Sequence, residues 1–151
     1  MTIIRRLAVA LACWALLVGS AGAETTQAKL EAFQFFGDWS PNCDQPPGPS
    51  NTRRHAFVSG SARAMFTESL GPDFRENVYS VLKASRAAAD RIELRIELNG
   101  AIIQHLSMVK QNDRMRTMIN RVRDGTFIVR DGIVLSTGRE TPWLSRCADS
   151  H

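Results

Sequence analysis

Arginine side chains are the most concentrated chemical groups in the C-terminal third of the sequence. Arg114 and Arg116 would share one face of a strand, because side chains alternate along a strand. A guanidinium grips a carboxylate or phosphate through two parallel hydrogen bonds, so such a cluster predicts contact with an acidic head group. A solvated face is the competing interpretation, since four carboxylates lie close by in sequence. The arginines are Arg114, Arg116, Arg121, Arg123, Arg130 and Arg139.

The histidines and hydroxyl groups form no recognisable catalytic arrangement. His55, His105 and His151 are isolated, no serine lies in a Gly-x-Ser-x-Gly turn, and no glycine-rich loop opens a helix. His105 shares a predicted strand face with Ile103 and Val109, which favours a histidine in a core or cavity. The sequence therefore favours a protein without catalysis, although an enzyme assembled from residues far apart in the chain stays open.

The segment that would position His105 gives the clearest structural signal. In residues 90–110, "DRIELRIELNGAIIQHLSMVK", apolar residues alternate with Arg and Glu before Asn99-Gly100. Such alternation is typical of a strand with one buried face, and Asn-Gly favours a type I′ turn. The pattern predicts a hairpin with strands at 91–98 and 101–110, whose outer face carries cross-strand Arg/Glu pairs.

Similar short strands precede and follow this hairpin, separated by Ser-Gly, Asn-Asp and Asp-Gly turns. Connections this short join antiparallel neighbours. The sequence predicts a mainly β fold, a single antiparallel up-and-down meander of eight or nine strands forming a barrel or strongly curved sheet, with a two-layer sandwich as the alternative. A short helix is expected in 25–36 and a helical turn in 141–147.

Apolar residues at alternating positions predict which side chains point into the barrel. Small neighbours on the same faces, such as Ala64, are typical either of a ligand cavity or of the taper of a filled barrel. A cavity of roughly 300 Å³ or more would favour ligand binding. The predicted inward residues are Phe57, Phe66, Val78, Leu82, Ile92, Leu94, Ile96, Ile103, Met115, Ile119, Phe127 and Val129.

The first 23 residues predict export. Two arginines, an apolar run over 7–18 and Ala21-Gly22-Ala23 are typical of a secretory signal peptide cleaved after Ala23. The run is shorter than the about 20 residues of a membrane-spanning helix, so no permanent span is expected. We predict a bacterial periplasmic or secreted protein with one β-barrel domain at 24–151. Cleavage lowers the net charge from +4 to +2, which does not favour nucleic-acid binding.

Cleavage would leave Cys43 and Cys147 as the only cysteines of the exported chain. An even pair in an oxidising compartment predicts a disulfide, with two free thiols as the alternative. Neither cysteine has a neighbouring cysteine at metal-ligand spacing, so no metal site is expected. A bond between them would close a loop over nearly the whole domain.

Gly37-Asp38-Trp39 resembles the Gly-x-Trp signature that opens the first strand of lipocalin-like (calycin) barrels, after a short N-terminal helix as here. The resemblance concerns architecture and covers residues 36–147 at most. It implies that Trp39 closes one end of the barrel, that a late arginine, Arg130 or Arg139, packs across it, and that a disulfide ties the C-terminal tail to the wall. It also implies binding in the barrel mouth.

Two functions fit these observations. The first is an exported, non-catalytic binding protein that holds a small apolar or amphipathic ligand in the barrel, with an arginine contact for an acidic head group. The second is a cell-envelope interaction or inhibitor module acting on a protein partner through the Pro-rich loop 45–51, because proline lowers the entropy lost on binding. Neither function requires a cofactor. The candidate ligand-binding residues are Arg114, Arg116, Arg130 and His105.

Overall fold

Strands form where apolar and polar side chains alternate. The computed structural model describes residues 24–148, so the predicted signal peptide lies outside the described residues. The strands are β1 (Gly37–Ser40), β2 (Arg53–Val58), β3 (Ala64–Ser69), β4 (Asn77–Ala88), β5 (Arg91–Leu98), β6 (Ile102–Gln111), β7 (Arg114–Val122), β8 (Phe127–Arg130), β9 (Ile133–Val134), β10 (Arg139–Glu140) and β11 (Leu144–Arg146).

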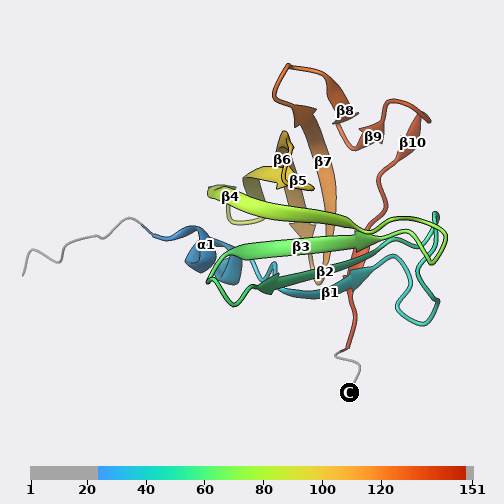
Figure 1. Cartoon of the computed structure of the whole chain (residues 1–151), viewed down its shortest axis with the longest axis horizontal. Coiled ribbons are helices and arrows are strands. Elements are labelled where there is room, and N and C mark those ends of the chain that lie inside the picture. Colours follow the sequence, from blue (N-terminus) through green and yellow to red (C-terminus); the bar gives the residue numbers. More distant parts are fainter. Residues whose placement is uncertain (1–23, 149–151) are drawn as a thin grey trace, which may run out of the picture.

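Eight of these strands close an antiparallel barrel (Figure 1). Strands β1 to β7 each pair with the next, and β11 pairs with both β7 and β1. The closing strand therefore joins the two edges that a seven-stranded meander would leave open. Strands β8, β9 and β10 extend from the C-terminal half of β7 as an arm outside the ring. The predicted antiparallel barrel is confirmed.

Short turns set the register between neighbouring strands. Asn99 and Gly100 have φ angles of 51° and 71°, and Asp131 and Gly132 have 51° and 76°. Both central residues of a type I′ turn need positive φ, which asparagine, aspartate and glycine tolerate better than other residues. These pairs stand at the β5–β6 and β8–β9 connections, as predicted.

A short helix, α1 (Thr26–Ala32), precedes the first strand. The side chain of Thr25 accepts a hydrogen bond from the backbone N–H of Ala28 at 3.1 Å, which caps the helix N-terminus. Leu30, Phe33 and Phe35 are fully or almost fully buried and belong to the core. The helix lies at one end of the barrel, opposite the β1–β2 and β3–β4 loops (Figure 1). The predicted N-terminal helix is confirmed. The described residues include no helix long and apolar enough to span a bilayer.

Trp39 is the largest fully buried side chain. Its indole N–H donates to the backbone oxygen of Phe35 at 2.9 Å, and the guanidinium of Arg146 lies 4.6 Å from its ring centroid. The same guanidinium donates to the backbone oxygens of Phe36 and Gln34, at 2.8 and 2.6 Å. Arg146 thus fastens the last strand to the segment between α1 and β1, and covers the tryptophan with a cation–π contact.

Gly37 makes this close approach possible. Its φ is 118°, and a Cβ at this position would lie 2.7 Å from Nη1 of Arg146. The prediction that Arg130 or Arg139 would cover the tryptophan is wrong. The late arginine is Arg146, which the sequence pattern had placed in a C-terminal helical turn.

The predicted helical turn at 141–147 is also wrong. Residues 144–146 form β11, and Leu144 is 5% exposed. A strand at this place fills the hydrogen-bonding positions of both β1 and β7, whereas a helix would leave both edges open, so tertiary pairing overrides local preference. The backbone N–H of Cys147 continues the contact by donating to Asp38 O at 2.8 Å.

Some of the predicted inward residues face the wrong way. On β4, Tyr79 and Val81 are buried, while Val78 is half-buried and Leu82 is exposed. Both faces of these strands carry apolar residues, so the alternation alone does not choose the inner one. An irregular register between Val81 and Lys83 also displaces Leu82. Phe57, Ile103, Ile119 and Phe127 are only partly buried. The predicted inward residues that are buried are Phe66, Ile92, Leu94, Ile96, Met115 and Val129.

Cys43 and Cys147 form a disulfide, as predicted. The bond joins the segment that follows β1 to the end of β11, across 104 residues of sequence. It therefore holds the first and last strands of the ring together at the position where the barrel closes.

We expect replacement of both cysteines by serine to lower the free energy of unfolding by about 4–5 kcal/mol, because the loop that the bond closes is long. Urea unfolding followed by tryptophan fluorescence measures the change. Wild-type protein in excess reductant is the control and should unfold at the same urea concentration as the double variant. A loss below about 1 kcal/mol would show that β11 pairing alone secures the closure.

Candidate functional site

A cavity of about 200 Å³ lies inside the barrel at the end that carries the β1–β2 and β3–β4 loops. We call it the mouth cavity. It is lined from β2, β3, β4, β6, β7, β8 and β11, and the side chains that matter chemically are Arg54, Glu68, Tyr79, Thr117, Asn120 and Thr141. The aromatic core around Trp39 and Phe66 fills much of the remaining interior. The cavity is smaller than the roughly 300 Å³ of a typical small-molecule pocket.

An ion pair forms one wall of the mouth cavity. Arg54 is 5% exposed, and its Nε and Nη2 donate to Oε1 of Glu68 at 3.0 and 2.5 Å. The hydroxyl of Tyr79 donates to the other carboxylate oxygen at 3.2 Å. The guanidinium also lies 4.9 Å from the ring centroid of Phe66, which stacks on Tyr79 at 4.4 Å. Pairing and stacking compensate the loss of solvation that burial imposes on both charges.

Burial raises the pKa of Tyr79, and the neighbouring negative charge of Glu68 raises it further, while the positive charge of Arg54 lowers it. The phenol therefore stays protonated at neutral pH and remains a hydrogen-bond donor to Glu68. This hydrogen bond holds the second oxygen of the Glu68 carboxylate, so both of its oxygens are engaged within the protein.

Some polar groups at this end of the barrel have no strong hydrogen-bond partner among the described residues. Nη1 of Arg54 contacts only the thioether sulfur of Met108, at 3.6 Å, which is a weak acceptor. Within the described residues, Oδ1 of Asn120 and Oε1 of Gln104 are buried without a hydrogen-bond partner. Asn120 lines the cavity. The cavity thus offers a donor and an acceptor to a molecule with a polar end.

The sequence analysis missed all three members of the Arg54–Glu68–Tyr79 group. Arg54 is not among the predicted inward residues, whereas its side chain points into the barrel beside Ala56. A signal was present, because Glu68 continues the inward face of Ala64 and Phe66, and Tyr79 shares the face of Val81. When the inward faces of two neighbouring strands carry opposite charges at the same end of the barrel, as Arg54 and Glu68 do, an internal ion pair is expected.

The predicted ligand contacts Arg114 and Arg116 do not reach the mouth cavity. They lie on the outer face of β7, with guanidinium carbons 5.5 and 5.3 Å from the ring centroid of Trp143. Arg116 also pairs with Glu140 at 3.3 Å. A Cβ at Gly132 would overlap its guanidinium, so the arm packs directly on it. These two arginines attach the β8–β10 arm and the chain before β11 to the barrel wall.

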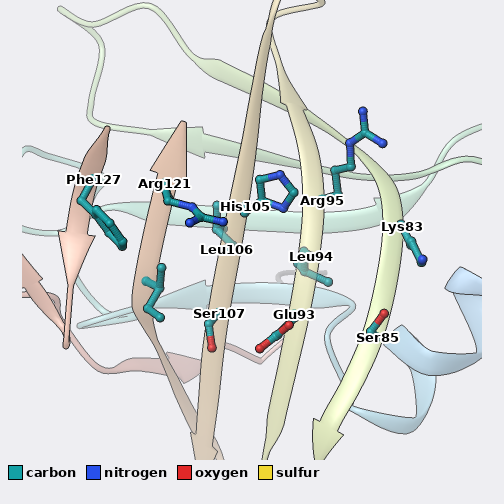
Figure 2. A pocket seen from close by; sticks show the side chains of 11 residues that line it. Lys83, Ser85, Glu93, Leu94, Arg95, His105, Leu106, Ser107, Arg121 and Phe127 are labelled. Carbon is teal, nitrogen blue, oxygen red and sulfur yellow. The ribbon is translucent and has the colours of Figure 1, made fainter. Parts of the chain in front are cut away.

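The other two predicted contacts, His105 and Arg130, lie on the outer side of the sheet. His105 is exposed, which corrects the expectation of a core or cavity histidine inside the barrel. It lines an open groove of about 490 Å³ on strands β4 to β8, with Lys83, Arg95 and Arg121 (Figure 2). Arg130 lies beside this groove, with its guanidinium 4.1 Å from the ring centroid of Phe127. The structure therefore divides the four predicted contacts between two outer regions.

The Pro-rich loop 45–51 is held in place by Asn51, which is 6% exposed. Its carboxamide oxygen accepts from Ser40 Oγ and from the backbone N–H of Asn42, at 3.0 and 2.9 Å. Its nitrogen donates to the backbone oxygens of Asn42, Gln45 and Pro46, at 3.0 to 3.1 Å. The loop is therefore organised around one buried side chain.

No three side chains of the kinds that bind metals converge within the described residues. No protein-family model, curated protein or solved structure matches the chain. The candidate function accordingly depends on the geometry of the barrel, and in particular on the mouth cavity and the outer groove.

The raised pKa of Tyr79 predicts a loss of stability at alkaline pH. The unfolded chain releases the phenolic proton near pH 10, the ordinary value, whereas the folded protein retains it to higher pH. The stabilisation is therefore complete below about pH 10 and is lost as the pH rises further. Because Tyr79 is the only tyrosine, phenolate absorbance during an alkaline titration reports on it alone. A native protein that ionises near pH 10 without unfolding would contradict the buried hydrogen bond.

Proposed function

We propose that the protein is an exported, non-catalytic binding protein that takes the polar end of a small amphipathic ligand in the mouth cavity. The observation that carries this proposal is the partly open mouth cavity, with a buried guanidinium and a buried unpartnered amide oxygen on its walls. Burial of an unpaired polar atom costs free energy, which a ligand donor at Asn120 would recover.

The architecture supports a lipocalin-like identity for the barrel. Gly37 and Trp39 open the first strand after a short helix, Arg146 covers the tryptophan, and Cys43–Cys147 ties the tail to the wall. These are the features that the Gly-x-Trp resemblance implies. The resemblance favours binding over catalysis, and the barrel mouth over the outer wall as the ligand site.

Export rests on the sequence of residues 1–23 and is supported by the disulfide. A structural bond between Cys43 and Cys147 is stable in an oxidising compartment such as the periplasm and is rare in the cytosol. A periplasmic or secreted location therefore agrees with both the leader pattern and the covalent structure.

The size of the mouth cavity restricts the ligand. At about 200 Å³ it accepts a small molecule, or one end of a longer one, rather than a whole drug-sized compound. The ion pair between Arg54 and Glu68 adds no net charge to the wall of the mouth cavity. The cavity therefore favours a ligand whose polar end is neutral and has both donor and acceptor atoms. The apolar remainder of the ligand would lie toward Leu70 and Val129, which also line the cavity.

Native mass spectrometry of protein purified from its own envelope tests this function. We expect a small molecule to co-purify with the wild type and to be lost from Asn120→Leu, which removes the acceptor without breaking a hydrogen bond. Gln111→Leu is the matched control, because Gln111 is exposed and lines neither hollow. It should retain the molecule. Wild-type protein that carries no small molecule, or Asn120→Leu that carries as much, would contradict the proposal.

A second candidate function is contact with a protein partner through loop 45–51. The favouring observation is the Asn51 hydrogen-bond network, which presents the exposed Pro46 and Pro49 on an ordered backbone and so lowers the entropy cost of binding. In a pull-down from envelope extract, a variant with both prolines replaced by alanine should lose a partner that the wild type retains. Retention of the same proteins by both would count against the loop.

A further inference from the structure

The outer groove contains a row of basic side chains that lie directly opposite one another. Lys83 on β4 pairs in register with Arg95 on β5, Arg95 pairs with His105 on β6, and His105 pairs with Arg121 on β7. Figure 2 shows these four side chains on the same side of the sheet, on successive strands. Directly opposed residues in antiparallel strands have Cβ atoms only about 5 Å apart.

Within this row Lys83 and Arg95 are two cations directly opposite each other, and like charges in this arrangement repel and destabilise the sheet. Within residues 24–148, Lys83, Arg95 and Arg121 form no ion pair with a carboxylate. The sequence had predicted Arg/Glu pairing across β5 and β6. The register instead places His105 opposite Arg95, and Ser107 opposite Glu93. The cations of the basic row therefore form no ion pair, and Glu93 is the carboxylate that lines the groove with them.

The neighbouring row supplies hydroxyl groups. Ser85, Glu93 and Ser107 lie opposite one another on β4, β5 and β6, two residues along each strand from the basic row. Ser107 is 5% exposed, so it lies at the floor of the hollow rather than on an open surface. Serine hydroxyls donate to anionic oxygens as the guanidinium groups do, and together they would surround a compact anion.

The β8 side of the groove is apolar and fixed. Phe127 lies opposite Arg121, and the guanidinium groups of Arg121 and Arg130 lie 5.7 and 4.1 Å from its ring centroid. Ile119 continues this wall beside Ser107. An irregular register between Asn120 and Arg121 accompanies the departure of β8 from the ring, which bends the wall.

From these contacts we infer that the groove is a binding site for a soluble phosphate monoester, separate from the mouth cavity. Three cations against the carboxylate of Glu93 leave an excess of two positive charges, which matches a phosphate dianion. Arginine forks and serine hydroxyls suit its oxygens. The groove volume of about 490 Å³ exceeds that of phosphate alone, so the organic part lies along Ile119 and Phe127. The floor position of Ser107 suits a compact ligand rather than a membrane surface.

Isothermal titration of the exported chain with phenyl phosphate tests the inference, with phenol as the uncharged comparison. We expect Arg95→Gln and Arg121→Gln each to raise Kd about tenfold or more, because each removes a charge-assisted contact. Arg91→Gln is the matched control. Arg91 is exposed on the same face of β5 but lies opposite Val109, outside both rows. It should leave Kd unchanged.

Thermal unfolding gives a second readout that general charge attraction would not produce. In phosphate-free buffer Arg95→Gln should raise Tm by about 1–4 °C, because it removes one of the two directly opposed cations. Phenyl phosphate should raise the Tm of the wild type and of Arg91→Gln by the same amount, and should raise that of Arg95→Gln by less at the same concentration.

Three results would overturn the inference: no binding of phenyl phosphate, an equal loss of affinity in Arg91→Gln, or binding only to vesicles that contain phosphatidic acid. Asn120→Leu, which alters the mouth cavity, should bind phenyl phosphate as the wild type does. The phosphate site in the groove and the ligand site in the mouth cavity can therefore be refuted independently of each other.

Discussion

Closure of the barrel depends on the pairing of a three-residue strand with two neighbours. Strand β11 gives its hydrogen-bonding groups to β1 on one side and to β7 on the other. A strand this short has little stability of its own, and its surroundings provide the rest. Leu144 is buried in the core, Arg146 lies over Trp39, and Cys147 is bonded to Cys43. The glycine at position 37, the first helix and the tail are all parts of this junction.

The charged side chains that line the mouth cavity, Arg54 and Glu68, form an ion pair with each other. Arg54 and Glu68 neutralise each other, and Tyr79 supplies the remaining hydrogen bond to the carboxylate. On the outer wall, solvent makes charge cheaper to expose, and the row from Lys83 to Arg121 has no carboxylate within ion-pairing distance among the described residues. The charges of Arg54 and Glu68 are therefore neutralised within the protein, whereas the cations of the outer groove attract anions from solution. The mouth cavity and the outer groove therefore differ more in the pairing of their charges than in their volumes.

The sequence predicted the class of fold, the helix and the type I′ turn because each has a local signal, and it predicted the disulfide from the number of cysteines. Asn99-Gly100 needs no distant residue to form a turn, and the two cysteines that follow the predicted signal peptide have one possible pairing. The positions that failed depend on partners far along the chain. Residues 144–146 become a strand only because β1 and β7 offer two open edges. The inner face of β4 was also undetermined, since both of its faces carry apolar residues.

The candidate sites were harder to predict than the fold for the same reason. His105 was correctly placed on a strand, but which face looks outward depends on the register of the whole sheet. The basic row exists only in that register, since Lys83, Arg95 and Arg121 are far apart in sequence. Arg114 and Arg116 share a face as predicted, and their neighbours Trp143 and Glu140 give them a structural role.

The closing strand also has a consequence for the order of folding. Trp39 pairs with Arg146, so the ring cannot be completed until residue 146 has been synthesised. Contacts of such long sequence separation require a large loop to close first, and barrels of this kind fold slowly. Until then β1 and β7 present unpaired edges, and Cys43 has no partner thiol. The nascent chain is thus exposed to aggregation until residues 144–147 have joined the sheet.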